Sequence, residues 1–323
     1  MQAVVTSNSK YVVRRPCLHR PIIPKRSYTY PAKTELSFHR EFWKNKFLNS
    51  NVSEPEESIQ NILAHVIGTN KISEVSKQFS LHLSNEQILK LEEMCELRLK
   101  SMPVQYIIGE WQFRDLTLKM RPPVFIPRPE TELLVDILLQ DMKRTNNVCD
   151  ILDICCGSGA ISLAILKEHS NIQVTAIDQS PEACQLTLEN AGVHHLENRI
   201  IVRQSEVTDE NRLSEIGTDF DVIISNPPYV PTADVDRVQP EIKLYEDLAA
   251  LDGGEDGLSI IRPILQIATE KLRQGGNLYL ETDPSHPVLI QTIIEDNPSL
   301  ALGHLKIYKD FCNKDRFVKM EKL

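Results

Sequence analysis

Apolar residues recur every three or four positions through the first part of the chain, which is the spacing of one face of a helix. This periodicity predicts helices over residues 38–48, 58–68 and 85–100, and Ser84 stands where it can cap the third. The pattern therefore predicts a small all-helical domain over residues 35–100. Nothing in this domain suggests catalysis.

After the third helix the pattern changes to short apolar runs separated by turns and prolines. Runs at residues 106–108, 111–113 and 116–120 predict short strands. The prolines that follow keep the backbone extended because they fix φ. We predict a β-hairpin connector over residues 101–128, followed by a helix that begins at Pro129.

From residue 150 onward, strand-like apolar runs alternate with helical periodicity. The predicted strands cover residues 150–154, 173–178, 199–203, 221–225 and 277–281, with two more at 305–308 and 317–319. The predicted helices cover residues 160–168, 181–191, 258–272 and 288–295. This alternation is typical of an α/β fold, and we predict a Rossmann-like, doubly wound, mostly parallel seven-stranded sheet over residues 129–323. Such sheets bind ligands beyond the carboxyl ends of their strands.

Charge is distributed unevenly along the chain. Residues 1–34 contain seven basic residues and no acidic one, so a total charge of −9 leaves −16 on residues 35–323. A basic, hydroxyl-rich and acid-free segment is typical of a mitochondrial transit peptide. We predict that residues 1–34 direct the protein to the mitochondrial matrix, and a disordered basic tail is the alternative. The acidic body disfavours nucleic acid as a partner and favours a basic protein.

The cysteines and the hydropathy exclude other classes. Seven cysteines at irregular spacing fit neither a disulfide framework nor a metal site built from cysteine pairs, so we expect reduced thiols and no metal. The adjacent Cys155 and Cys156 are interpreted as small residues that pack at a turn. No apolar run approaches the roughly 20 residues of a membrane span, so no membrane partner is expected.

A glycine-containing loop follows the first predicted strand of the α/β region. Its candidate cofactor-binding residues are Cys155, Cys156, Gly157, Ser158 and Gly159. Asp178 ends the second strand, 19 residues after Gly159, where an acid can accept hydrogen bonds from both hydroxyls of a ribose. Such a loop suits NAD as well as S-adenosylmethionine. After the third strand, Glu206 is a candidate for the adenine amino group and Val207 for the adenine face.

The sequence Asn226-Pro227-Pro228-Tyr229 follows the fourth strand. An amide nitrogen is a poor nucleophile because its lone pair is delocalised into the carbonyl. The side-chain oxygen of Asn226 and the carbonyl of Pro227 can each accept one N–H of a target amide, which would orient the nitrogen and stabilise its developing charge. Tyr229 offers a flat surface to a planar group. This tetrapeptide therefore predicts methylation of a planar nitrogen.

Together, these residues resemble the HemK-type (PrmC-type) release-factor glutamine methyltransferases. The resemblance runs from about residue 102 to residue 316. Its most specific part is the combination of Asn226-Pro227-Pro228-Tyr229 with the upstream Pro127-Arg128-Pro129-Glu130-Thr131-Glu132. Cys155 departs from the family, which has glycine at the first position of the loop.

The resemblance implies a class I methyltransferase fold and a defined reaction. A methyl group would pass from S-adenosylmethionine to the glutamine amide in the GGQ motif of a release factor. Residues Cys155–Gly159, Asp178 and Asn226 would hold the cofactor, and residues Asn226–Tyr229 the glutamine. The helical domain would help to dock the release factor, which the predicted transit peptide makes a mitochondrial one.

Two other functions remain open at this point. An adenine-N6 methyltransferase acting on RNA or DNA shares the Asn-Pro-Pro-Tyr sequence, although it needs a basic binding face. A non-catalytic S-adenosylmethionine-binding assembly protein could use the same fold, because a fold does not determine a function.

Overall fold

The computed structural model describes residues 34–69, 81–145, 150–208 and 216–323. The predicted transit peptide therefore lies outside the described residues, except for Thr34. Among the helices that are described, none is both long and apolar enough to cross a membrane.

The helical region that comes first contains α1 (Leu36–Asn49), α2 (Pro55–Ile67), α4 (Asn85–Arg98) and α5 (Val104–Ile108). Its buried apolar side chains, which include Trp43, Phe47 and Leu91, form one core. The hydroxyl of Ser84 accepts the backbone N–H of Gln87 at 3.2 Å, and the Gln87 side chain accepts the backbone N–H of Ser84 at 2.9 Å. The three predicted helices and the cap of the third are confirmed.

The strand predicted at residues 106–108 is wrong, because this segment lies in the short helix α5. Pro103 precedes the helix with φ near −55°, and Gly109 ends it in the left-handed region at φ 81°. Both Ile107 and Ile108 pack on the core of the helical region. Flanking residues and packing therefore override the strand preference of a short β-branched run.

A two-stranded antiparallel hairpin links this region to the large sheet. It pairs β1 (Glu110–Phe113) with β2 (Leu116–Lys119), as predicted. Helix α6 (Pro129–Thr145) then begins at the predicted proline.

The rest of the chain alternates strands with helices. The strands are β3 (Asp150–Ile154), β4 (Gln173–Asp178), β5 (Ile200–Gln204), β6 (Phe220–Ser225), β7 (Leu272–Glu281), β8 (Leu302–Lys309) and β9 (Asp315–Lys322). The longer helices are α7 (Ala160–Glu168), α8 (Pro181–Val193), α12 (Ile261–Lys271) and α13 (His286–Asp296). The short ones are η1 (Glu197–Arg199), α10 (Thr232–Val235), α11 (Pro240–Tyr245), η2 (Leu248–Ala250) and η3 (Pro298–Leu300).

The seven strands form one sheet in the order β5-β4-β3-β6-β7-β9-β8. The first five in this order are parallel, and β9 is antiparallel to both of its neighbours. The predicted doubly wound, mostly parallel, seven-stranded sheet is confirmed, as is the helical region that precedes it.

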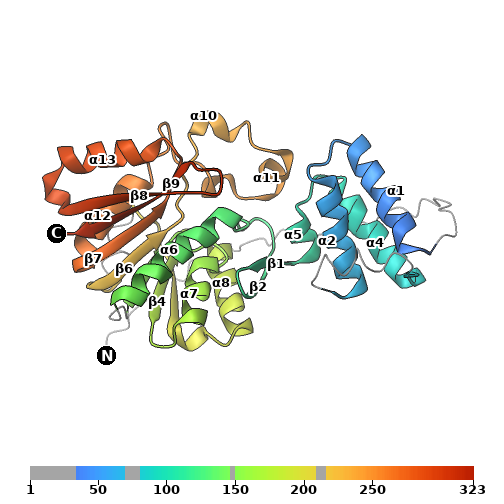
Figure 1. The fold of residues 1–323 in the computed structure, drawn as a ribbon, viewed down its shortest axis with the longest axis horizontal. Helices are drawn as coiled ribbons and strands as arrows, with labels where there is room; N and C mark the ends of the chain where they lie inside the picture. The colour runs from blue at the N-terminus through green and yellow to red at the C-terminus, as the bar shows by residue number, and fades with distance from the viewer. Residues whose placement is uncertain (1–33, 70–80, 146–149, 209–215) are drawn as a thin grey trace, which may run out of the picture. The chain divides into compact units, whose positions relative to one another are not determined.

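Helices cover both faces of this sheet (Figure 1). On β6, Val222 and Ile224 belong to the core that α6 and α7 close, whereas Ile223 belongs to the core that α12 closes. Successive side chains of a strand point to opposite faces, so a strand buried on both sides must be apolar throughout. This explains the uninterrupted apolar run that made β6 recognisable in the sequence.

Candidate active site

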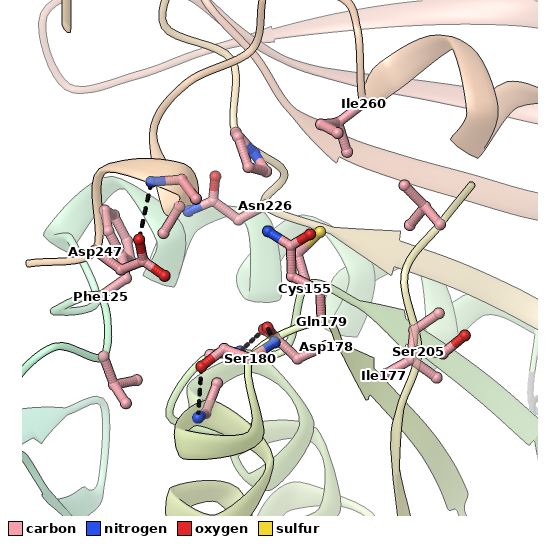
Figure 2. A pocket seen from close by; sticks show the side chains of 17 residues that line it. Phe125, Cys155, Ile177, Asp178, Gln179, Ser180, Ser205, Asn226, Asp247 and Ile260 are labelled. Atoms are coloured by element: carbon pink, nitrogen blue, oxygen red, sulfur yellow. Dashed lines mark hydrogen bonds between the residues drawn. The ribbon is translucent and has the colours of Figure 1, made fainter. Parts of the chain in front are cut away.

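The loops that follow β3, β4, β5 and β6 surround one pocket of about 720 Å³ at the carboxyl edge of the parallel strands. Figure 2 shows Cys155, Asp178, Ser205 and Asn226 around it, one residue from each loop. In register, Ile154 of β3 lies beside Ile177 of β4 on one side and Ser225 of β6 on the other. The loops after these three strands therefore meet at one place.

Asp178 forms one wall of the pocket, as predicted from its position at the strand end. One of its carboxylate oxygens accepts the backbone N–H of Gly157 and the other accepts that of Ser180, both at 2.9 Å. Burial raises its pKa, and the negative charge of Asp247 raises it further, whereas backbone hydrogen bonds from Ser180, Gly157 and Gln179 oppose the rise. A carboxylate has about four lone-pair sites, so Asp178 can also accept from a ligand hydroxyl.

Residues of the glycine-containing loop have different positions. Cys155 and Gly157 line the pocket, while Cys156 and Ser158 are buried behind it. Cys155 has a φ of 63°, in the left-handed region that favours glycine. The Cys156 sulfur lies 3.6 Å from the hydroxyl oxygen of Thr187, which fits the interpretation of a small residue packed at the turn.

Gly159 also lies behind the pocket, where it precedes α7 with a φ of 82°. The hydroxyl of Thr187 donates to the carbonyl of Gly157 at 3.0 Å, and the side chain of Asn190 donates to the carbonyl of Ser158 at 2.9 Å. Two side chains of α8, Thr187 and Asn190, therefore hold the glycine-containing loop in place through its carbonyl groups.

The loop after β5 contributes Ser205 and Val207 to the pocket but not Glu206. Val207 is buried, and its contact with the adenine face stays a prediction. Glu206 is exposed, and its carboxylate accepts the hydroxyl of Thr208 at 2.8 Å. The structure does not place Glu206 among the pocket residues, so its contact with an adenine amino group stays a prediction.

The Asn-Pro-Pro-Tyr segment leaves β6 toward the same pocket. Asn226 and Pro228 line it, while Pro227 is buried and Tyr229 is partly buried. Val230 then exchanges backbone hydrogen bonds with the 251–253 segment, both at 2.8 Å. A Cβ on Gly257 would lie 2.5 Å from the carbonyl oxygen of Tyr229, so this close packing requires glycine.

Two residues to which the sequence assigned no role, Thr131 of the Pro127–Glu132 segment and Glu281, contact the predicted catalytic side chains. The Asn226 side-chain nitrogen donates to the Thr131 hydroxyl at 3.1 Å, and this hydroxyl donates to the Glu281 carboxylate at 2.8 Å. The other Glu281 oxygen accepts the Tyr229 hydroxyl at 3.1 Å. Glu281 and Thr131 are both buried, and burial raises the pKa of Glu281 to about 7.

Further pocket residues come from the connector and from the loop after α11. They are Val124, Phe125, Asp247, Ala249, Ala250 and Ile260, together with Gln179, Ser180, Ala183 and Ile177 near β4. The backbone N–H of Asp247 donates to the carbonyl of Pro123 at 2.8 Å, which brings these two segments together. The prolines of the connector predicted an extended backbone, but no sequence pattern indicated which of its side chains enter the pocket.

The residues present fit S-adenosylmethionine, which combines an adenine ring, a ribose with two hydroxyls and a positively charged arm. Ile177, Val207 and Ile260 offer an apolar surface to the ring. The carboxylates of Asp178 and Asp247 offer acceptors to hydroxyl groups and negative charge to a cation.

Comparison with known proteins gives matches over most of the chain. Residues 41–109 match the family model described as the PrmC N-terminal domain, and residues 116–242 match the methyltransferase small domain. The chain is 39% identical to the human "MTRF1L release factor glutamine methyltransferase", over 87% of this chain and 85% of that protein. It is 37% identical to the "Release factor glutamine methyltransferase" of Thermodesulfovibrio yellowstonii, over 86% of this chain and 95% of that protein.

Proposed function

Since this chain belongs to the release factor glutamine methyltransferase family, we propose that it methylates the GGQ glutamine of a mitochondrial peptide chain release factor at its side-chain nitrogen, N5. Membership of this family and the enzyme class, protein-glutamine methyltransferase, were both predicted from the sequence and are confirmed. The observation that carries the proposed substrate is the Asn226-Pro227-Pro228-Tyr229 segment at the cofactor pocket.

The cofactor side of the pocket positions the methyl donor. S-adenosylmethionine, when bound, supplies an electrophilic methyl group on a positively charged sulfur. Asp178 would hold the ribose, and the carboxylates of Asp178 and Asp247 would attract the positive charge. Cys155 and Gly157 line the same pocket as these acids and Asn226.

The substrate side of the pocket orients the glutamine. The Asn226 side-chain oxygen and the Pro227 carbonyl would accept the two N–H groups of the target amide, and Tyr229 would support its plane. These acceptors hold the nitrogen lone pair in a fixed direction and stabilise the positive charge that grows on the nitrogen. No strong base is required, because the methylated nitrogen loses its proton readily.

Transfer of labelled methyl groups tests the proposed reaction. The full chain is incubated with labelled S-adenosylmethionine and a recombinant mitochondrial release factor, or with the same factor whose GGQ glutamine is changed to alanine. We expect label on the intact factor, none on the altered factor, and none with an Asn226→Ala enzyme that still binds the cofactor. Label on added RNA instead would indicate an adenine-N6 methyltransferase, and cofactor binding without transfer to any substrate would indicate a non-catalytic protein.

The proposed mitochondrial location rests on the composition of residues 1–34. A fluorescent protein fused to residues 1–34 should enter mitochondria, and a fluorescent protein fused to the chain that lacks them should remain outside. If both fusions distribute alike, the basic segment has another role and the release factor need not be mitochondrial.

A further inference from the structure

Behind the proposed glutamine site lies a buried chain of polar side chains from three parts of the sequence. Thr131 belongs to the first turn of α6, Glu281 ends β7, and Asn226 and Tyr229 follow β6. Thr131 and Glu281 are 3% and 1% exposed, so solvent does not compete for their hydrogen bonds. Neither residue lines the cofactor pocket, so both act through Asn226 and Tyr229.

While Glu281 is ionised, the hydrogen bonds that join Asn226, Thr131 and Glu281 have only one possible direction. A carboxylate accepts hydrogen bonds and cannot donate them. The single hydroxyl hydrogen of Thr131 therefore points to Glu281, at an oxygen–oxygen distance of 2.8 Å. The Thr131 oxygen is left as an acceptor toward Asn226, so the atom of Asn226 that faces it must be the NH2 nitrogen, 3.1 Å away.

This direction decides what Asn226 presents to a substrate. With its NH2 group held by Thr131, its oxygen is turned away, and no described residue donates to that oxygen. We propose that Glu281 is a positioning residue that acts through Thr131 to keep the Asn226 oxygen, rather than its nitrogen, toward the target amide. The inference rests on the proposed function, because only an amide or amine substrate needs an acceptor there.

A loss of the negative charge removes the constraint. A protonated carboxyl, or a glutamine in its place, can donate to Thr131, whose hydrogen can then point to the Asn226 oxygen of an inverted side chain. Asn226 would present its NH2 group to the NH2 group of the substrate, and two donors cannot pair. The substrate nitrogen would lose one of the acceptors that orient it.

The groups around Glu281 set the pH at which this occurs. Burial raises its pKa to about 7, whereas the hydroxyls of Thr131 and Tyr229 and the positive charge of Arg316 on β9 oppose the rise, and Glu130 on α6 adds a smaller increase. Burial and the nearby carboxylate also raise the pKa of Tyr229, which keeps its hydroxyl a donor. Since ionised Glu281 is required, the methylation rate should rise with pH through about 7.

Kinetics of full-length variants on the release factor test the inference. We expect Glu281→Gln and Thr131→Val to lower kcat by about tenfold to a hundredfold, less than the roughly hundredfold to thousandfold lost with a direct polar contact to the transition state, because both residues act through Asn226. The affinity for S-adenosylmethionine should stay within about twofold, since neither residue lines its pocket. Thr131→Ser keeps the hydroxyl and should restore most of the rate.

Thr269→Val is the matched control. It also removes a hydroxyl that is bonded to backbone carbonyls, those of Leu265 and Leu300, but it lies on α12 across the sheet and should leave kcat unchanged. The rise in rate through pH 7 should be present in the wild type and the control and absent in Glu281→Gln. The inference is overturned by a Thr131→Ser enzyme as slow as Thr131→Val, or by a Glu281→Gln enzyme that keeps the wild-type rate and pH profile.

A spectroscopic measurement separates this inference from the proposed function. In the full chain labelled with ¹⁵N-asparagine, the Asn226 NH2 signal is assigned by its loss in Asn226→Ala. We expect this signal to shift in Thr131→Val and Glu281→Gln, to remain in Thr131→Ser, and to change with pH near 7 in the wild type. That pattern without methylation of any release factor would contradict the proposed substrate and support the positioning role. An Asn226 signal that stays the same in Thr131→Val, in Glu281→Gln and across pH 7 would refute the positioning role.

Discussion

Gly157 and Gly159 stand two residues apart in the same loop, yet alanine should damage different properties at the two positions. Both have positive φ, 57° and 82°, so either alanine carries backbone strain. A Cβ on Gly159 would lie 2.9 Å from the Thr187 methyl carbon and 3.3 Å from a Leu163 methyl carbon. A Cβ on Gly157 meets no atom within 4 Å, and Gly157 lines the cofactor pocket.

The expected magnitudes follow from these contacts. Left-handed backbone costs an alanine about 1–2 kcal/mol at either position. The contacts at Gly159 add the cost of overpacking, about 1–3 kcal/mol, because Thr187 is fully buried and cannot move aside freely. Gly159→Ala should therefore lower the free energy of unfolding by roughly 2–5 kcal/mol, and Gly157→Ala by roughly 1–2 kcal/mol. The difference of about 1–3 kcal/mol separates the two melting temperatures by about 2–12 °C, at about 2–4 °C per kcal/mol for a large domain.

Thermal unfolding and calorimetric titration with S-adenosylmethionine measure the two effects on the full chain. Gly157→Ala should weaken cofactor binding by about tenfold or more, since its methyl group enters space at the pocket wall. Gly192, which is on α8 and also has no atom within 4 Å of an added Cβ, gives a control alanine without left-handed strain. Equal melting temperatures for Gly157→Ala and Gly159→Ala, or normal cofactor binding by Gly157→Ala, would refute this assignment of the two glycines.

Substitutions at three other positions test the backbone strain at Cys155, the buried ion pair of Glu241 with Arg98, and the core of the helical region at Trp43. At the left-handed position of Cys155, glycine should be more stable than alanine by about 1 kcal/mol in thermal unfolding. Burial favours a higher pKa for Glu241, but hydrogen bonds from Ser53 and the charge of Arg98 hold the pKa below its ordinary value, so Glu241→Gln should cost about 2 kcal/mol at neutral pH. A lowered folded-state pKa stabilises fully above the unfolded pKa and progressively less as pH falls toward the folded pKa, so urea unfolding should show this cost shrinking as pH falls below about 4. Trp43→Ala should cost about 3–5 kcal/mol in urea unfolding, because Trp43 is fully buried, while cofactor affinity in the native protein stays unchanged.

Elements with a strong local pattern could be predicted from the sequence. The apolar run of β6 is buried on both faces, and a polar tetrapeptide ends it, so both the strand and the position of Asn226 could be predicted. Asp178 could be identified in the same way, from the end of β4. In each case, the apolar side chains whose pattern predicts the strand are the ones that pack in the core.

The remaining parts of the site depend on contacts between distant segments. Thr131 and Glu281 are 150 positions apart and hydrogen-bonded, and each alone resembles an ordinary helix start or strand end. Phe125 and Asp247 reach the pocket because their loops are held together by one backbone hydrogen bond and by the Glu246 side chain, and local sequence does not indicate a contact over about 120 positions. Glu206 lies between Ser205 and Val207, which line the pocket, but is not itself a lining residue, and its contact with an adenine amino group stays a prediction.

The sheet order explains why the two halves of the reaction occupy opposite sides of one loop. From β3 the chain proceeds outward through β4 to β5, and then returns to place β6 on the other side of β3. The loops after β3 and β6 consequently diverge and leave a crevice at this switch point. Asp178 lies on the β4 side, while Asn226, Tyr229 and Glu281 lie on the side of β6 and β7, together with Asp247 and Ile260 of the pocket. Changes in the acceptor for the methyl group can therefore arise on the β6 and β7 side without altering Asp178 and the other pocket residues around β4.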